Sequence, residues 1–382
     1  MKHNITTLTF IATAMSLLSS CQGGTDNNVT LYAGTYGNAI HILSYNTQTG
    51  KIDSRGTIPA TSASYLALGG TNSRGEDVIY AVSETGETSG VYSFAKGAQG
   101  WHQTAYTNEV GADPCFILPI EGSGNIVTAD YSGGSYSLFG TDDGAITGRT
   151  QVASFETVYD GQPPVAGRQD AAHIHQVREI PASIIKATGA EGRFFLASDL
   201  GNDLIRVLRY TGNSLEQIST ISCGAGAGPR HMEFNQSANM LYCITELSGE
   251  IIAWSISAAD STPVFTEAQR FVADKLNAGG SADIHLHPNG KWLYASHRLQ
   301  GDGITIMDVD ATGHLEISGF RATGIHPRNF TFSPDGKRIL VACRDTKDIQ
   351  VYDIDQNSGM LSESFQSYVF EDDLPVCLVF AD

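Results

Sequence analysis

The sequence predicts an all-β fold, a seven-bladed β-propeller of four-stranded antiparallel blades. Seven segments share one pattern, in which an apolar strand of the type Leu-Tyr-Ala is followed by a polar turn and a second strand with alternating apolar residues. Successive segments start 48, 47, 69, 46, 52 and 47 residues apart. A repeat of this length, with several short strands per unit, is typical of propeller blades rather than of solenoids.

The seven repeats can be counted along the chain. Their Leu-Tyr strands begin at Leu31, Ile79, Ile126, Phe195, Leu241, Leu293 and Leu340. The one long offset, between the third and fourth repeats, predicts an insertion around residues 151 to 190.

A further strand precedes the Leu-Tyr strand in the later repeats, at residues 229–235, 281–288 and 327–334. The last two are followed by Asn-Gly or Asp-Gly, which supply the positive φ of tight hairpins. Each unit is therefore expected to be a four-stranded meander whose first strand lies nearest the axis. Residues 375–382 (PVCLVFAD) have the form of a first strand with no second strand after it. We expect this C-terminal strand to join the N-terminal blade and close the ring, which removes free sheet edges.

The N-terminus predicts export. Residues 1–20 have the basic start, apolar run and small residues of a signal peptide. The segment Leu18-Ser19-Ser20-Cys21 resembles a bacterial lipobox, which implies cleavage before Cys21 and lipid on its sulfur. Residues 21–28 would then form a lipid-tethered linker and residues 29–382 the propeller, on the periplasmic side or at the cell surface. An ordinary cleaved signal with an incidental cysteine is the alternative.

Charge and cysteine spacing restrict the partners. The formal net charge is −18, so repulsion disfavours nucleic acid and leaves the lipid on Cys21 as the expected membrane contact. No paired spacing typical of metal sites occurs among the other cysteines, which we expect to be buried thiols: Cys115, Cys223, Cys243, Cys343 and Cys377. The oligomeric state is left open.

In an antiparallel meander, the start of the first strand and the end of the second lie at the same end of the sheet. Both sets of residues should therefore surround one mouth of the central channel. The ends of the second strands are Tyr36, Glu84, Tyr131, Leu200, Glu246, Arg298 and Asp345, and the first strands contribute Arg230, Arg328 and His175. Three arginines and a histidine in an acidic protein indicate a small anionic ligand, because guanidinium groups bind carboxylate or phosphate.

Glu246 is the candidate proton acceptor at this mouth. Nearby cations should lower its pKa and keep it ionised. Opening of a lactone needs a base together with cationic groups that hold the developing oxyanion, which the arginines could supply. The alternative is that Glu246, Arg230 and Arg298 form a purely structural salt-bridge network that closes the channel.

At these residues the chain resembles the bacterial 6-phosphogluconolactonase family, seven-bladed propellers related to the carboxymuconate cyclase of fungi. The matching stretches are residues 226–235 (GAGPRHMEFN), 241–254, 282–298 and 326–342, and the likeness covers nearly all of the chain after the leader. The resemblance implies that the site contains Arg230, Glu246, Arg298 and a histidine, assigned to His175 rather than His173. One departure is Thr245 where the family usually has asparagine.

The resulting function prediction is a hydrolase that opens a sugar lactone without a cofactor or metal. Glu246 would be the base, Arg230 and Arg298 the clamps and His175 a second proton-transfer group, with Arg328, His231 and His285 as substrate contacts. A phosphorylated cytosolic lactone is an unexpected substrate for an exported protein, so the substrate is left open. Two alternatives remain, a non-catalytic surface propeller that binds a small acid, glycan or protein, and a muconate-type cycloisomerase.

Two strands carry residues that could either bind a metal or line the channel. His173 and His175 share one strand face, as do Asp283, His285 and His287, at spacings that a metal site would allow. Polar residues alternating with Ile284 and Leu286 are more simply explained as channel lining or as pairs between blades. We therefore expect no metal.

Overall fold

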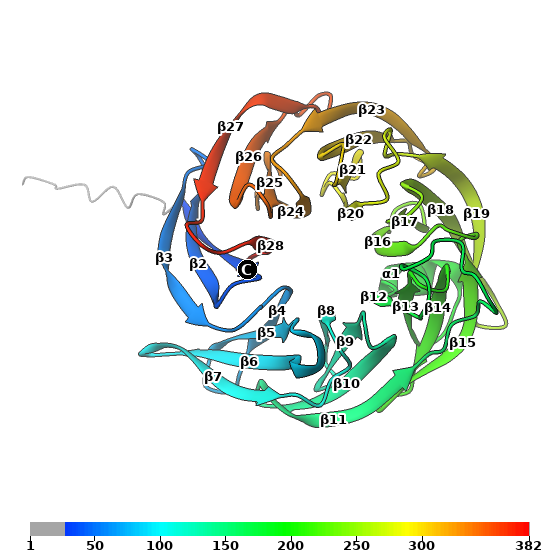
Figure 1. The fold of residues 1–382 in the computed structure, drawn as a ribbon, viewed down its shortest axis with the longest axis horizontal. Coiled ribbons are helices and arrows are strands. Elements are labelled where there is room, and N and C mark those ends of the chain that lie inside the picture. Colours follow the sequence, from blue (N-terminus) through cyan, green and yellow to red (C-terminus); the bar gives the residue numbers. More distant parts are fainter. Residues whose placement is uncertain (1–26, 382) are drawn as a thin grey trace, which may run out of the picture.

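The predicted propeller is confirmed by a computed structural model, which describes residues 27–381. Seven four-stranded antiparallel sheets surround a central axis (Figure 1). Blade one contains, from the axis outward, β28 (Pro375–Phe380), β1 (Asn28–Thr35), β2 (Ala39–Asn46) and β3 (Ile52–Pro59).

The other six blades follow the chain in order, and the lowest-numbered strand of each lies nearest the axis (Figure 1). Blades two to four are β4 (Leu66–Thr71), β5 (Asp77–Ser83), β6 (Gly90–Gly97) and β7 (Gly100–Thr107); β8 (Pro114–Ile120), β9 (Asn125–Asp130), β10 (Ser135–Asp142) and β11 (Ala145–Ser154); and β12 (Ile174–Glu179), β13 (Arg193–Asp199), β14 (Leu204–Tyr210) and β15 (Leu215–Ser222).

Blades five to seven have the same arrangement. Their strands are β16 (Pro229–Asn235), β17 (Met240–Thr245), β18 (Glu250–Ala259) and β19 (Thr262–Val272); β20 (Ser281–Leu286), β21 (Trp292–His297), β22 (Gly303–Val309) and β23 (Leu315–Ala322); and β24 (Pro327–Phe332), β25 (Arg338–Cys343), β26 (Asp348–Ile354) and β27 (Leu361–Val369). Within residues 27–381, helical structure is limited to α1 (Ala182–Thr188) and one 3-10 turn at Gly86–Thr88.

The C-terminal strand closes the ring, as the sequence predicts. Strand β28 pairs antiparallel with β1, and Leu31 lies opposite Phe380 and Ala33 opposite Leu378. The first blade is thus built from both ends of the described chain, and the inner edge of β1 is paired with β28.

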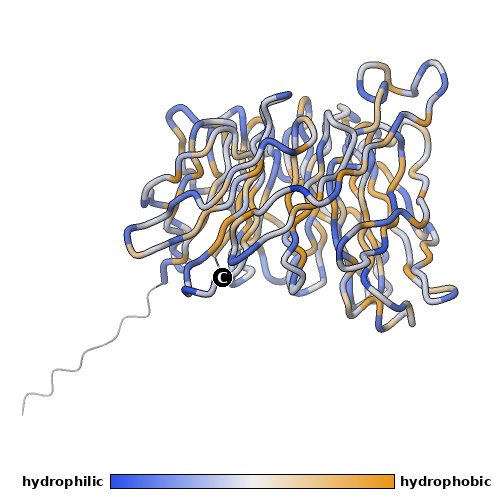
Figure 2. Tube along the Cα trace, turned by 90° about the horizontal axis from the view of Figure 1, so that it is seen from below, coloured by the Kyte–Doolittle hydropathy of each residue, from blue (hydrophilic) through white to orange (hydrophobic). Residues whose placement is uncertain are grey.

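The core lies between neighbouring blades. Apolar side chains of one blade pack on those of the next; Leu31 and Leu43 of blade one, for example, share a buried cluster with Leu340 and Val351 of blade seven. Hydrophobic stretches run along the strands, whereas many of the turns at the two ends of the propeller are hydrophilic (Figure 2). Burial of each such side chain contributes about 1.5–3 kcal/mol, so the ring is held by its inter-blade seams.

The expected insertion divides into two parts. Residues 155–173 form an irregular loop between β11 and β12, and α1 lies between β12 and β13. The loop is fixed to blade four by Asn202, whose side chain accepts from the amide of Val158 (2.8 Å) and donates to the carbonyl of Glu156 (3.1 Å). The Tyr159 hydroxyl donates to the carboxylate of Asp203. The loop therefore has a defined position at the mouth.

Two further expectations concern cysteines and the membrane. All five cysteines within residues 27–381 are buried and free, as expected for thiols that act as small apolar side chains. The predicted signal peptide and Cys21 lie outside the described residues. In the part of the chain that the structure describes, no helix is long and apolar enough to cross a membrane.

Candidate active site

Glu246 lies at the mouth where first strands begin and second strands end. It directly follows β17, and its backbone N–H donates to the carbonyl of Gly228 (2.7 Å), which precedes β16. Gly228 has φ +64°, and a Cβ there would come within 2.5 Å of Leu247. Glycine at this position therefore allows the close approach of the two segments that places Arg230 beside Glu246.

Three guanidinium groups hold the Glu246 carboxylate. Arg230 donates from Nε to Oε2 (2.8 Å), and Nη2 of Arg298 lies 3.1 Å from the same oxygen. Arg168 donates from Nη2 to Oε1 (2.6 Å). Both carboxylate oxygens are thus occupied by cations that come from β16, the end of blade six's second strand and the 155–173 loop.

Two of these arginines are anchored by backbone as well. Nη1 of Arg230 donates to the carbonyl of Ala282 (2.6 Å), and Nε of Arg298 donates to that of Gly280 (2.6 Å). Both side chains are buried, whereas the Arg168 side chain is 36% exposed. Arg230 and Arg298 are therefore fixed parts of the site, and Arg168 is its solvent-facing cation.

The ionisation of Glu246 follows from these contacts. Burial would raise its pKa, but the charges of Arg298, Arg230 and Arg168 outweigh burial and lower the pKa to about 2. The expected lowering is confirmed, and Glu246 is ionised at neutral pH. Such a carboxylate is a weak proton acceptor, because its basicity falls with its pKa. In addition, both of its oxygens already accept hydrogen bonds from guanidinium groups.

A cavity of about 210 Å³ lies beside this cluster. Its lining residues come from several blades and from the 155–173 loop: Tyr36, Glu84, Cys115, Tyr131, Arg168, His175, Glu246 and Arg328. Six of these eight residues belong to the mouth predicted from the sequence. The salt bridges that the sequence left as an alternative therefore exist, and of their three residues only Glu246 also lines the cavity.

Arg328 is the second cation that faces this cavity. Its Nη2 lies 4.0 Å from Oε1 of Glu84, and its guanidinium lies 5.5 Å from the centre of the Tyr36 ring. Burial would lower the pKa of Arg328, but Tyr36 and Glu84 raise it above its ordinary value, so the group stays charged. The cavity lining thus contains two cations, Arg168 and Arg328, which can bind an anionic ligand.

Of the two candidate histidines, His175 lines the cavity. Burial, followed by the charges of Arg230 and His231, lowers the pKa of His175 well below its ordinary value, so its ring is neutral. His173 instead stacks on the ring of Tyr131, with ring centres 4.4 Å apart, and its Nδ1 lies 2.9 Å from the Tyr131 carbonyl.

The other two histidines expected as substrate contacts differ in their surroundings. His231 lies away from the mouth cavity and lines a smaller one beneath it. His285 belongs to the lining of neither cavity, because its ring nitrogens face Glu233 (3.4 Å) and Asp283 (3.1 Å). Burial would lower the pKa of His285, but these carboxylates raise it to about 10. The geometry does not support a substrate contact for His285.

Among residues 27–381, no group of three or more His, Cys, Asp or Glu side chains is placed to hold a metal ion. Asp283 pairs with His231 of the neighbouring blade, and the Nε2 of His287 lies 2.8 Å from the Gly336 carbonyl. These side chains therefore pair between blades.

The sequence did not reveal two residues of the mouth cavity, Arg168 and Cys115. Arg168 lies in the insertion, which the long offset between repeats predicts without placing it at the mouth. Cys115 is a conceivable nucleophile by type, but burial raises the pKa of its thiol well above the ordinary value, and it lies 3.3 Å from the His175 carbonyl, to which it donates. It is therefore an unreactive thiol.

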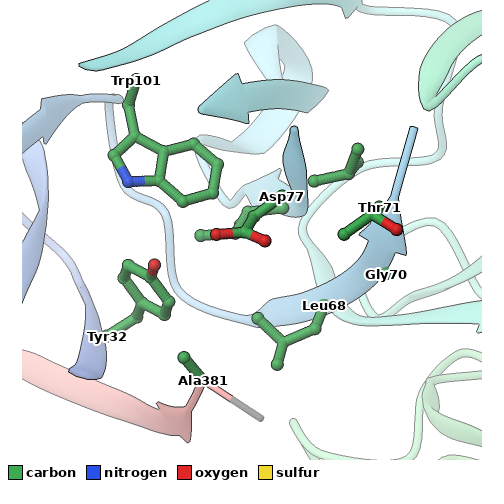
Figure 3. Close-up of a pocket in the computed structure, with 9 residues that line it drawn as sticks. Tyr32, Leu68, Gly70, Thr71, Asp77, Trp101 and Ala381 are labelled. Atoms are coloured by element: carbon green, nitrogen blue, oxygen red, sulfur yellow. The ribbon is translucent and has the colours of Figure 1, made fainter. Parts of the chain in front are cut away.

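A further cavity, also about 210 Å³, lies at the opposite end of the propeller between blades one and two. Tyr32, Leu68 and Trp101 line it together with Asp77 (Figure 3). None of the described residues that line it is Arg, Lys or His, so it lacks the cations of the mouth.

Comparisons with known proteins agree with this architecture. The sequence profile of the family described as "Lactonase, 7-bladed beta-propeller" matches residues 30–380. A 6-phosphogluconolactonase of Formosa agariphila is 28% identical over 343 residues, which cover 87% of this chain and 93% of that protein. Crystal structures of proteins proposed as 6-phosphogluconolactonases from Bacteroides fragilis (36% identity, TM-score 0.82) and Bacteroides uniformis (33%, 0.81) cover 94% and 93% of this chain and 99% and 100% of their own. The chain therefore belongs to the seven-bladed β-propeller lactonase family.

Proposed function

We propose that this protein hydrolyses a sugar lactone at the mouth cavity. The observation that carries the proposal is the placement of two charged, cavity-facing guanidinium groups, those of Arg168 and Arg328, around a space of about 210 Å³ beside the neutral His175. A space of this size suits a small ring rather than a polymer. Family membership and the relatives named 6-phosphogluconolactonase support the same reaction.

The reaction adds water to the lactone carbonyl. A carbon–oxygen bond forms to the water, negative charge develops on the carbonyl oxygen, and the ester bond to the ring oxygen then breaks as that oxygen receives a proton. Arg328 and Arg168 can donate to the developing oxyanion or to an anionic substituent such as phosphate. Loss of one such donor typically costs about 2.7–4 kcal/mol of transition-state stabilisation.

In this mechanism Glu246 has a positioning role. Its carboxylate compensates the buried charges of Arg230 and Arg298 and holds Arg168 over the cavity. This role differs from that of the base suggested by the sequence, and it follows from a carboxylate whose two oxygens are both taken.

The test is a panel of sugar lactones, phosphorylated and unphosphorylated, assayed with purified residues 22–382 by following acid release. We expect ring opening above the spontaneous rate, a loss of roughly 100-fold or more in kcat/KM for Arg328→Gln, and an unchanged rate for Arg74→Gln, a control at the opposite end. Tight binding without turnover would instead support a non-catalytic propeller. Conversion of an unsaturated dicarboxylate without hydrolysis would support a cycloisomerase.

We also propose that the protein is exported and anchored by lipid on Cys21. The support is the leader of residues 1–20 and the lipobox-like Leu18-Ser19-Ser20-Cys21. Wild-type protein should enter the membrane fraction and carry the mass of an acylated N-terminus, whereas Cys21→Ser should be soluble and unacylated. Equal partition of both would contradict the anchor. With the protein exported, its substrate is a lactone present outside the cytosol.

A further inference from the structure

A second, smaller cavity lies beneath the mouth. It shares Glu84, Cys115, His175 and Arg328 with the mouth cavity, so the two adjoin. Its volume is about 10 Å³, room for a single water molecule. The cavity therefore suits a reactant the size of water rather than the lactone itself.

Three side chains that line this small cavity each carry a buried polar atom without a partner among residues 27–381. The atoms are Oγ of Ser64, Nδ1 of His175 and Nε2 of His231. The rings of His175 and His231 come from neighbouring blades, and their centres are 5.1 Å apart. Because burial of a polar atom without a partner is unfavourable, three of them on one water-sized cavity indicate a bound polar molecule.

His231 is oriented by a carboxylate on the next blade. Its Nδ1 lies 2.7 Å from Oδ1 of Asp283. Burial opposes ionisation of Asp283, but His285 and His231 lower its pKa well below the ordinary value. An ionised carboxylate only accepts hydrogen bonds, so Nδ1 of His231 carries the proton and Nε2 presents a lone pair.

Asp283 is itself held in place. Its Oδ2 accepts from Nδ2 of Asn329 (2.6 Å) and lies 3.1 Å from Nε2 of His285. Its Oδ1 also accepts from the amide of Ile284 (3.0 Å). The carboxylate is therefore fixed by blades six and seven while it orients a ring on blade five, an arrangement that fixes the tautomer of His231.

We propose that the small cavity holds the hydrolytic water and that His231, positioned by Asp283, takes its proton. This inference rests on the proposed lactone hydrolysis. Nε2 of His231 accepts a proton as the water oxygen bonds to the lactone carbon, and it returns that proton to the ring oxygen as the ester bond breaks. His175 and Ser64 hold the water, and Asp283 stabilises the imidazolium that forms in between.

The neutral state of His231 at pH 7 agrees with this role. Burial and the charge of Arg230 lower its pKa to about 4, against the opposing effect of Asp283. The charged groups around it are Arg230, Asp283 and His285, with Arg328 and Glu84 across the small cavity. The ring is thus unprotonated throughout the neutral range, and its Nε2, unlike the two oxygens of Glu246, has no hydrogen-bond partner among residues 27–381.

The first experiment compares turnover of the lactone that the wild type opens fastest. His231→Ala should lower kcat by about 100- to 10,000-fold with KM changed less than about threefold, and added imidazole should restore part of the rate. Asp283→Asn should lower kcat and move the acid limb of the pH profile, while Asp283→Glu restores part of the rate. His287→Gln, a buried histidine outside both cavities, is the matched control and should keep the wild-type rate.

Unfolding midpoints of all variants show which of them fold. A folded His231→Ala enzyme within threefold of the wild-type kcat, or one that imidazole does not rescue, overturns the inference and leaves lactone hydrolysis standing.

A second measurement does not depend on turnover. A high-resolution crystal structure should show one solvent molecule within hydrogen-bond distance of His231 Nε2 and His175 Nδ1, and the nitrogen NMR shifts of His231 should report a proton on Nδ1. A dry cavity, or a proton on Nε2, overturns the inference. If the site is as described but no lactone is opened, the proposed function fails, and with it the catalytic role of His231.

Discussion

At the scale of single residues, the site depends on charge compensation. Arg230 and Arg298 are buried almost completely, and Glu246 is the carboxylate that both contact. Removal of one partner from a buried ion pair typically costs about 3–5 kcal/mol, because an uncompensated charge is left in a poorly solvated place. Glu246 therefore stabilises the fold as well as the site.

The prediction for Glu246 concerns the pH dependence of stability. Its pKa falls from 4.5 in the unfolded chain to about 2 in the folded protein, so its ionisation contributes about 3 kcal/mol of stability at neutral pH. A lowered folded-state pKa gives stability that is present above pH 4.5 and lost as the pH falls towards 2.

The measurement is the free energy of unfolding of wild type and Glu246→Gln between pH 7 and 2.5. The wild type should be more stable at pH 7, and the difference should shrink below about pH 4.5. A difference that stays constant with pH would show that the carboxylate charge is not the stabilising feature. The control Glu316→Gln, on the outer strand β23, should have the same free energy of unfolding as the wild type at every pH.

At the scale of elements, strands were predictable and the loop that completes the mouth was not. The seven Leu-Tyr strands and the closing strand follow from alternation and repeat length, so the positions of Glu246, Arg230 and Arg298 at one mouth could be inferred. The 155–173 loop has no periodicity, and its position depends on Asn202 and Asp203, whose roles only appear in three dimensions. The pairing of His231 with Asp283 could not be predicted either, because the alignment of one blade against the next produces no pattern in the sequence of either strand.

Asp203 connects the segment before Arg230 to the 155–173 loop. Its Oδ2 accepts from the amide of Gly226 (2.7 Å) and from the Tyr159 hydroxyl, and its Oδ1 accepts from the amide of Gly228 (2.7 Å). Asp203→Ala should therefore loosen both the segment before Arg230 and the loop that carries Arg168.

For Asp203→Ala we expect roughly a tenfold or greater fall in kcat/KM, the order of losing about 1.4 kcal/mol, and faster amide hydrogen exchange in residues 155–173 and 224–228. Tyr159→Phe removes only the contact to the loop, so exchange should rise in residues 155–173 alone. Equal protection of both segments in Asp203→Ala would contradict this coupling.

At the scale of the whole molecule, the site exists only while the ring is closed. The mouth cavity takes Tyr36 from blade one, Glu84 from blade two and Arg328 from blade seven. These residues are far apart in the sequence, and the inter-blade seams set the distances between them. Strand β28 completes the seams on both sides of blade one, since Leu378 packs towards blade seven and Cys377 towards blade two.

Removal of residues 375–382 should therefore abolish activity through the fold rather than through the chemistry. The truncation exposes the inner edge of β1 and the apolar side chains that β28 covers. Burial of each aliphatic side chain contributes about 1.5–3 kcal/mol to stability. We expect a lower unfolding midpoint, loss of the monodisperse peak in size-exclusion chromatography and no lactone turnover. Removal of residues 381–382 alone should leave all three unchanged. A truncated protein that keeps its midpoint and stays monodisperse would show that the ring does not need the closing strand, and that the distances across the mouth are set within the blades themselves.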